Sequence, residues 1–438
     1  MFDSDVGRHM YELACKLFPY NRSITGNGVR KTLKEIKKIL SDLTIFEVES
    51  GSKVFDWEIP DEWDCQDAYI VTPSGEKICN FKVNNLHVMG YSTCIDDYLP
   101  LDELQKKLHS KEDLPEAIPY VTSYYERDWG FSISHKQRQE LTDGRYRVFI
   151  DSKHKKGHLT YGEVVLKSNS KARINKEIFL STYICHPSLA NNEISGPVVT
   201  TYLLKWLKNL KNRKFDYRAV FVPETIGSIA YLAKNYQKLK ENVIAGFNIT
   251  CVGDDNSYSF LPSRNGNTLS DIVAKHVLKH HTKVFEEYSF LDRGSDERQY
   301  CSPGIDLPIA SIMRTKYGEY EQYHTSLDDL DFISDKGLNG AFEALVLSIV
   351  CIENNQIYKS TNLCEPQLSR HGLRSTISAV NAVDNMTQFN KDVANVLAYA
   401  DGKKDLISIA IEVERPLWEL IPVVDKLVEY NLLINVHG

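Results

Sequence analysis

The chain has 438 residues, of which 42% are hydrophobic and 25% are charged, and its formal net charge is −7. This length allows two or three domains with cores of their own. The acidic balance gives no general reason to expect nucleic acid or an anionic membrane as a partner.

The first residues, "MFDSDVGRHMYELACKLF", carry acids where a secretory signal needs positive charge. No stretch approaches the roughly 20 apolar residues that are needed to span a bilayer. Nine cysteines are scattered without a CxxC pair, a pattern typical of reduced thiols. We therefore expect a cytoplasmic protein that does not enter the membrane.

The first third of the chain contains two different sequence patterns. Residues 1–50 have the periodicity of two amphipathic helices, and the expected strand "LTIFEVES" follows them. Residues 52–148 are rich in aromatics, Pro and Gly and contain short alternating runs such as "YRVFID", which predict a β-rich module. Because residues 1–51 are too few to fold alone, we expect them to join the body that follows. The β-rich module is then an inserted domain.

Expected strands and helices alternate over residues 149–360. The strands "LTYGEVVL" and "EIFLSTYI" precede the helix "SGPVVTTYLLKWLKNL", and the strand "YRAVFVPE" precedes a second helix. Such alternation predicts an α/β domain with a mostly parallel sheet covered by helices on both faces.

Residues 361–438 have a winged-helix pattern, with a helix, an Asp-Gly turn, a short helix, a helix started by Pro and a final apolar strand. Winged helices often bind DNA. Residues 366–438, however, carry seven Lys and Arg against nine Asp and Glu. Since DNA binding depends on neutralising phosphates, this charge argues against DNA and favours protein docking or homo-oligomer formation.

Three expected strands lead to residues of the types that bind metals in proteins. His186 follows "EIFLSTYI", Glu224 ends "YRAVFVPE", and His324 lies in the loop after "LPIASIM". Each alone has an ordinary interpretation, as a hydrogen-bonded loop histidine or a helix-capping glutamate. Their recurrence at the carboxyl edge of one sheet indicates a site, because two imidazoles and a carboxylate are a hydrolytic zinc set.

The segment "LDRGSDERQYCSPG" precedes the strand that leads to His324. Most charge runs of this kind are simply solvated. In this position, however, Arg298 could bind a substrate carboxylate and Asp296 could bind an amine. Tyr323 or Tyr317 could donate a hydrogen bond to a developing oxyanion.

The segments "STYICHPSLANNEISGPVV", "FVPETIGSIAYL", "GSDERQYCSPGIDLP" and "YHTSLDDLDFI" resemble the co-catalytic zinc aminopeptidase family, which includes glutaminyl cyclases. The chain is still more similar to a bacterial aminopeptidase-like subgroup associated with polysaccharide-biosynthesis genes. In that subgroup "LFPYNRSITGNGVRKTL" and "AIPYVTSYYERDWGFSISHKQRQ" look like signature segments. The resemblance covers essentially the whole chain. It implies a mixed, mostly parallel sheet of about eight strands, a β-rich insertion and a winged helix.

The family's metal ligands are only partly present. Asn192 stands where the resemblance places a bridging Asp, Thr250 where it places another Asp, and Glu224 alone where it places a Glu-Glu pair. The resemblance therefore implies one zinc ion rather than two, held by the three residues His186, Glu193 and His324. Glu224 is then the general base, or a fourth protein ligand if it matches the ligand member of the pair. Asn192 would be a further ligand only if two ions bind.

Two functions remain open from the sequence. The first is a single-zinc exopeptidase or amidase that acts on a small peptide or an amino-acyl conjugate. The second is a catalytically inactive peptidase-fold scaffold or binding protein that works through its inserted and winged-helix domains.

Overall fold

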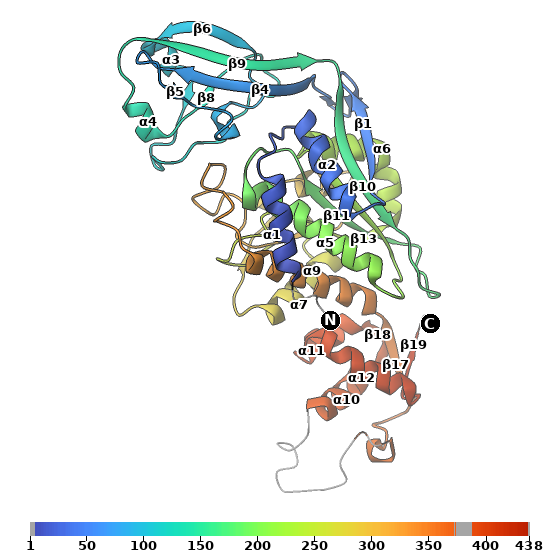
Figure 1. Ribbon diagram of the computed structural model, residues 1–438. Helices are drawn as coiled ribbons and strands as arrows, with labels where there is room; N and C mark the ends of the chain where they lie inside the picture. The colour runs from blue at the N-terminus through green and yellow to red at the C-terminus, as the bar shows by residue number, and fades with distance from the viewer. Residues whose placement is uncertain (1–4, 372, 374–387, 437–438) are drawn as a thin grey trace.

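A computed structural model describes residues 5–371, 373 and 388–436 of the chain (Figure 1). A central α/β body lies between a β-rich domain at one end and a small helical domain at the other. The expected fold class is therefore confirmed. Part of the tail over which the winged helix was predicted lies outside the described residues.

The body is built on a mixed sheet of eight strands in the order β1-β10-β12-β11-β13-β16-β14-β15. The four strands β12, β11, β13 and β16 are parallel, and β1 and β10 pair antiparallel with their neighbours. The strand β14 pairs antiparallel with β16 and parallel with β15. All residues of β11 and β12 are buried, as expected of central parallel strands. The strands are β1 (Thr44–Glu49), β10 (His158–Leu166), β11 (Glu177–Tyr183), β12 (Asp216–Val222), β13 (Val243–Asn248), β14 (Ser259–Leu261), β15 (Glu286–Glu287) and β16 (Ile309–Met313).

Helices cover both faces of this sheet. Ile178 and Leu180 of β11 share a core with α1, α2, α5, α7 and α9, while Phe179 between them shares a core with α6 and the inserted domain. Successive strand residues point to opposite faces, so this alternation separates the two cores. The helices are α1 (Val6–Leu17), α2 (Asn27–Ile39), α5 (Ser195–Asn209), α6 (Ile226–Asn242), α7 (Leu269–His281) and α9 (Asp335–Asn354).

Among the described residues, the helix α9 is long and apolar enough to cross a membrane by length and composition alone. The sequence-based expectation that no stretch approaches such a span is therefore wrong for this helix. Of its most apolar window, 67% is buried inside the protein, and α9 belongs to the main hydrophobic core. This burial gives its apolar composition a structural cause, since a core helix is hydrophobic on most sides.

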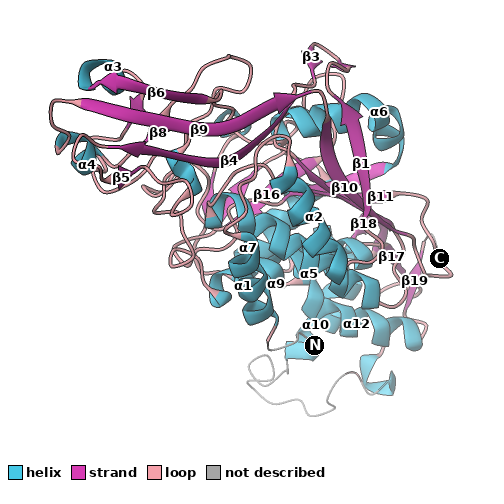
Figure 2. Cartoon of the chain, turned by 45° about the horizontal axis from the view of Figure 1, so that its top comes forward, coloured by secondary structure: helices cyan, strands magenta, loops and turns pink. Residues whose placement is uncertain are grey.

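The inserted domain is a twisted sheet of four strands in the order β5-β4-β9-β6 (Figure 2). The predicted boundary at 148 lies inside β9, so this domain continues to Lys155. Its two ends meet, because the backbone N–H of Ser50 donates to the carbonyl of Gly157 at 2.9 Å. The elements are β2 (Lys53–Val54), β3 (Trp57–Glu58), β4 (Glu62–Val71), β5 (Lys77–Ile78), β6 (Ile95–Pro100), α3 (Leu101–Gln105), β7 (Leu108–His109), β8 (Phe131–Ser132), α4 (His135–Gln139) and β9 (Arg145–Lys155).

The C-terminal domain combines helices with a sheet of three strands in the order β18-β17-β19. The strand β17 precedes residue 361, so this domain begins earlier than the sequence predicts. Its apolar side chains continue the core of the body. The elements are β17 (Ile357–Ser360), α10 (Gln388–Tyr399), β18 (Asp401–Asp405), α11 (Leu406–Glu412), α12 (Leu417–Glu429) and β19 (Leu433–Asn435).

Candidate functional site

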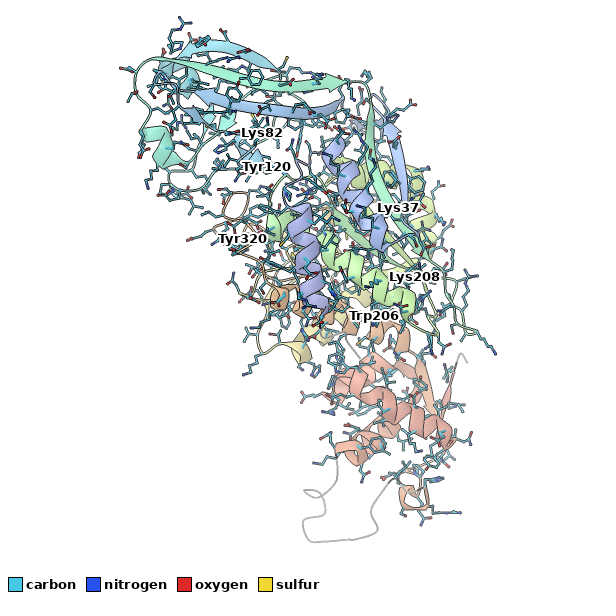
Figure 3. The ribbon with its side chains drawn as sticks, in the orientation of Figure 1. Lys37, Lys82, Tyr120, Trp206, Lys208 and Tyr320 are labelled. Carbon is cyan, nitrogen blue, oxygen red and sulfur yellow. The ribbon has the colours of Figure 1, made fainter. Side chains whose placement is uncertain are left out.

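A cavity of about 450 Å³ opens at the carboxyl edge of the central sheet. It contains His186, Glu224 and His324, the three residues that the sequence places at the ends of three expected strands or in the loop beyond. The inserted domain supplies much of the wall, and Figure 3 shows Tyr120 at the junction of the two domains. The remaining lining residues are Ile24, Trp57, Thr122, Tyr124, Tyr125, Cys185, Thr225, Ile226 and Arg298.

The imidazole of His186 is buried and is fixed from behind. Its Nδ1 lies 2.9 Å from Oε2 of Glu193, and the other oxygen of Glu193 lies 3.3 Å from Nε of the buried Arg22. Burial opposes the protonated form of His186, but the hydrogen bond and charge of Glu193 outweigh burial and raise its pKa. Because Nδ1 faces a carboxylate, the ring presents Nε2 to the cavity.

Arg22 also fixes the backbone of this turn. Its guanidinium donates to the carbonyls of His186 and Pro187, at 2.8 and 3.1 Å. The next segment, Ala190–Ile194, is a π-helical turn that leads directly into α5, which brings Glu193 back toward His186. The local chain path therefore decides which edge of the ring Glu193 can reach.

Glu193 and Glu224 lie on different edges of the His186 ring. Glu193 contacts Nδ1, whereas Oε2 of Glu224 lies 3.6 Å from Nε2. The sequence analysis assigned Glu193 to the metal and Glu224 to the base. These contacts instead make Glu224 the carboxylate that faces the cavity edge of His186.

The donor atoms of Cys185, His186 and Glu193 lie within 4.8 Å of one another and form a group that could hold a metal. Burial strongly raises the pKa of the Cys185 thiol, whose sulfur accepts a hydrogen bond from the backbone N–H of Glu224 at 3.2 Å. A thiol must lose its proton to bind a metal, and the cation of Arg22 already neutralises Glu193. This group is therefore better described as a hydrogen-bonded network that supports His186.

His324 provides the second imidazole, with its ring centroid 5.4 Å from that of His186. It stacks on Tyr323 at 3.9 Å and has a φ of 55°, a left-handed conformation that is uncommon outside glycine. Burial and the nearby His186 lower the pKa of His324 to about 3. Its Nε2 is buried and makes no hydrogen bond to the described residues. A neutral imidazole nitrogen without a partner fits a metal ligand.

Glu224 stands at the start of α6, and burial is the main cause of its raised pKa. The next residue, Thr225, has a φ of 63°, and its backbone N–H donates to Asp296 at 2.8 Å. Burial and the charge of Glu224 raise the pKa of Asp296 to about 8. Asp296 also accepts from the hydroxyl of Ser228, so its contacts fix the start of α6 and lie outside the cavity lining.

Of the predicted substrate-binding residues, Arg298 reaches the cavity. It is exposed, follows Glu297 in the short helix α8 (Glu297–Tyr300), and donates to the hydroxyl of Thr225 at 2.7 Å. Tyr323 packs on His324 and lines a separate cavity. The hydroxyl of Tyr317 donates to the carboxylate of Glu297 at 2.6 Å, so the hydrogen of this hydroxyl is used in a contact within the protein.

The positions at which the family resemblance implies further metal ligands hold neutral residues in a buried network. Asn192 donates to the hydroxyl of Tyr183 at 2.7 Å, and that hydroxyl lies 2.5 Å from the hydroxyl of Thr250. The backbone N–H of Asn192 donates to Asp328, whose pKa burial raises to about 7. Two neutral side chains in place of carboxylates give a second cation little charge compensation.

Two contributors were missed from the sequence. Arg22 lies in "LFPYNRSITGNGVRKTL", and Tyr120 lies in "AIPYVTSYYERDWGFSISHKQRQ", the two segments that were noted as signatures without a role. The ring of Tyr120 lies 5.1 Å from that of His186 and 5.2 Å from that of His324, and its hydroxyl lies 2.7 Å from the hydroxyl of Tyr124. Neither residue follows an expected strand of the α/β body, so no pattern in the sequence indicated this placement.

Comparison with known protein families matches residues 11–355 to a family described as "Domain of unknown function (DUF4910)". Residues 356–435 match a winged helix-turn-helix family, which confirms the C-terminal module expected from the sequence. A Clostridium acetobutylicum protein, provisionally named a polysaccharide biosynthesis protein with aminopeptidase-like domain, is 43% identical over 410 residues. The match covers 93% of this chain and 92% of the relative.

Solved structures share the same architecture. A crystal structure from Clostridium acetobutylicum, provisionally described as a peptidase, matches with a TM-score of 0.91 at 41% identity and covers 99% of this chain and 97% of that chain. The zinc aminopeptidase BSAP from Bacillus subtilis matches with a TM-score of 0.58 at 13% identity and covers 79% of this chain and 94% of its own. The second likeness shows the fold alone. Together the matches confirm the aminopeptidase-like resemblance.

Proposed function

Because the chain belongs to the DUF4910 family of aminopeptidase-like proteins, we propose that it is a metal-dependent exopeptidase or amidase. Its substrate is a small peptide or an amino-acyl conjugate. The observation that carries the proposal is the cavity in which a buried imidazole, a half-buried imidazole and one carboxylate converge at the carboxyl edge of the sheet. Ligands of open α/β folds bind at this edge.

One zinc ion is proposed to be held by Nε2 of His186, Nε2 of His324 and the carboxylate of Glu224. The buried and unpartnered Nε2 of His324 fits this set. So does the 3.6 Å separation of His186 Nε2 from Glu224 Oε2, since both atoms can lie about 2 Å from one ion. Glu193 is proposed as a positioning residue that holds His186 through Nδ1, the role that carboxylates behind metal-binding histidines play.

When bound, zinc would polarise a substrate carbonyl and lower the pKa of a water molecule. The residues of the chain supply the rest. Arg22 and Glu193 hold the proton of His186 on Nδ1, and burial keeps His324 neutral. Trp57, Tyr120 and Tyr124 restrict water, and Arg298 offers a cation to a negatively charged part of the substrate.

A size of about 450 Å³ suits a small ligand rather than a folded protein. The name of the 43% identical relative refers to polysaccharide biosynthesis. This supports a substrate in which an amino-acyl or amide group is attached to a saccharide, with the amide or acyl bond as the bond that is cleaved. The C-terminal domain is proposed to dock a protein or a second copy of the chain.

The alternative is a binding protein without catalysis. Asn192 and Thr250 stand where co-catalytic zinc aminopeptidases have anionic ligands, and they favour this alternative. These neutral residues leave one metal site where that family has two. The two functions differ in whether a bound metal supports hydrolysis.

Metal analysis tests the proposal directly. After purification without added metal and reconstitution with zinc, the wild-type chain should hold about one ion. His186→Ala and His324→Ala should hold little, and His9→Ala, a half-buried histidine far from the cavity in the chain, should match the wild type. Near-zero zinc in the wild type would refute the metal site. Zinc at full occupancy without hydrolysis of any amino-acyl or short-peptide substrate would favour the binding protein.

A further inference from the structure

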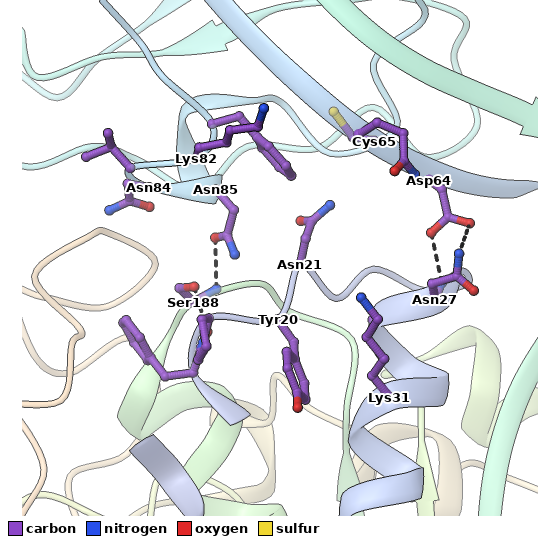
Figure 4. Close-up of a pocket in the computed structure, with 16 residues that line it drawn as sticks. Tyr20, Asn21, Asn27, Lys31, Asp64, Cys65, Lys82, Asn84, Asn85 and Ser188 are labelled. Atoms are coloured by element: carbon purple, nitrogen blue, oxygen red, sulfur yellow. Dashed lines mark hydrogen bonds between the residues drawn. The ribbon is translucent and has the colours of Figure 1, made fainter. Parts of the chain in front are cut away.

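A second cavity, of about 490 Å³, lies between the N-terminal segment and the inserted domain. Its lower wall is the segment after α1 together with the start of α2, and its upper wall is the start of β4 with the segment 81–85 (Figure 4). It shares one turn with the candidate active site, because His186 lines the first cavity and Ser188 lines the second. The proposed hydrolase chemistry uses none of its residues.

Hydrogen bonds within the protein already engage the carboxylate and one amide oxygen of this cavity. The two oxygens of Asp64 accept from the backbone N–H and the side-chain amide of Asn27, at 2.9 and 3.0 Å. Oδ1 of Asn85, which is 8% exposed, accepts from the backbone N–H of Ser188 at 3.2 Å. The NH₂ group of an amide cannot accept a hydrogen bond, so this bond fixes the Asn85 amide with its oxygen toward Ser188 and its NH₂ group directed elsewhere.

The groups left for a ligand are an ammonium group and side-chain amides. Figure 4 shows the side-chain amide of Asn21 and the ammonium group of Lys31 directed into the space between Asn85 and Asp64. Within the part of the chain that the structure describes, no hydrogen bond or ion pair is found for either group, nor for the NH₂ group of Asn85. A free ammonium group and free amides, in a cavity whose carboxylate is already hydrogen-bonded, favour a ligand rich in acceptors.

The shape of the cavity is imposed by the backbone. A Cβ atom at Gly28 would lie 1.9 Å from the carbonyl oxygen of Asn21, so the start of α2 packs directly on the turn that carries Asn21. Phe18, Tyr20 and Phe81 also line the cavity, although Figure 4 shows the Tyr20 ring directed away from the space between Asn85 and Asp64. Amides that bond hydroxyl groups, next to aromatic surface that covers a C–H face, form the usual composition of a site for a sugar ring.

We propose that this cavity binds a saccharide that carries an anionic group, either a carboxylate or a phosphate. The amides of Asn21 and Asn85 would bond ring hydroxyls, and Lys31 would bind the anion. The lining also holds Lys82, which pairs with Asp67 at 3.0 Å, while Asp64 is the acid of the lining. The local charge therefore favours an anionic over a neutral sugar.

Calorimetric titration of the full chain with glucuronate, glucose 6-phosphate and glucose tests the proposal. At least one of the anionic sugars should bind, with a dissociation constant on the order of 1 mM, and glucose should bind more weakly. Lys31→Met should weaken the anionic sugar about tenfold without changing the glucose titration. Lys37→Met is the matched control, because Lys37 is an exposed lysine of the same helix that does not line the cavity (Figure 3).

The other outcomes overturn the proposal. If glucose and the anionic sugars bind equally well, or if Lys31→Met has no effect, the anionic group of the ligand is not recognised and the proposal is wrong. Inorganic phosphate that binds as tightly as glucose 6-phosphate would reduce the cavity to an ion site. Absence of binding by all three sugars would refute the saccharide site. His324→Ala should titrate as the wild type, which separates this cavity from the proposed metal site, whatever the outcome for hydrolysis.

Discussion

The backbone N–H of Tyr120 donates a hydrogen bond to the carbonyl of His324 at 2.8 Å. Beside it, Pro119 and Thr325 form an isolated antiparallel bridge. The inserted domain is thus joined to the loop that carries one of the two imidazoles, and its aromatic side chains complete the cavity. The candidate site belongs to both domains.

Replacement of Tyr120 tests this joint construction. Tyr120→Ala removes a ring that contacts both imidazoles, and we expect about a tenfold loss of zinc affinity, since each aromatic contact contributes about 0.5–1.5 kcal/mol. Tyr120→Phe keeps the ring and should stay close to the wild type. Tyr98→Ala, at an exposed tyrosine of the same domain, is the control. Zinc competition with a chelator measures the effect, and equal losses in Tyr120→Phe and Tyr120→Ala would assign the role to the hydroxyl.

Glu193→Gln tests the positioning of His186. The amide keeps the shape but lowers the charge next to Nδ1, and zinc affinity should fall about 10–100-fold without disappearing. Because Arg22 would lose its buried partner, unfolding should also become easier by about 3–5 kcal/mol. Zinc titration and urea unfolding measure the two effects, with the exposed Glu140→Gln as control. Complete loss of zinc would restore Glu193 as a direct ligand.

Glu224→Gln separates a metal ligand from a general base. If Glu224 binds the metal, the variant should lose more zinc affinity than Glu193→Gln, because an amide is a weaker ligand than a carboxylate. Hydrolysis should be lost as well. A variant that retains wild-type zinc affinity but no hydrolysis would identify Glu224 as the base that the sequence analysis first predicted.

The joint between the body and the C-terminal domain should respond to pH. Nε2 of His276 accepts from the backbone N–H of Leu417 at 3.0 Å. Burial, with smaller effects of His280 and Lys279, lowers the pKa of His276 from 6.5 to about 4. Between these values the unfolded chain binds a proton that the folded chain does not. The contribution of His276 to the free energy of unfolding is therefore fully present above pH 6.5 and is lost as the pH drops toward 4. The slope from this group is at most about 1.4 kcal/mol per pH unit.

His276→Gln provides the check, since the amide oxygen can still accept the hydrogen bond but does not titrate. Urea unfolding of the wild type and the variant across this pH range should show a flatter dependence for the variant. An unchanged slope would place the titration on another group.

The winged-helix domain should have no measurable affinity for duplex DNA at moderate salt. In helix-turn-helix proteins the start of the recognition helix contacts the bases. Here the start of α12 packs on the body, with the ring of Trp418 6.0 Å from that of His276 and 6.2 Å from that of His280. Fluorescence anisotropy of a labelled duplex with the full chain tests this expectation at several salt concentrations. Salt-sensitive binding would contradict both the charge and the packing.

The sequence by itself determined the order of the domains and the residues that meet at the edge of the sheet. Uninterrupted apolar strands encode burial on both faces, so His186 and Glu224 had to emerge at one carboxyl edge, and His324 followed from the loop after β16. These are consequences of local periodicity and chain direction, which short stretches of sequence carry. The apolar pattern of the tail fixed its winged-helix elements in the same way.

Only the tertiary structure decided what surrounds these residues. Which edge of the His186 ring Glu193 reaches depends on a π-helical turn and on Arg22, which approaches from a distant part of the chain. Tyr120 reaches His324 only because the inserted domain folds back over the body. Likewise, only the packing of other helices around α9 shows that its long apolar stretch belongs to the hydrophobic core. Side-chain orientation and long-range packing depend on the whole fold at once, and no local pattern in the sequence specifies them.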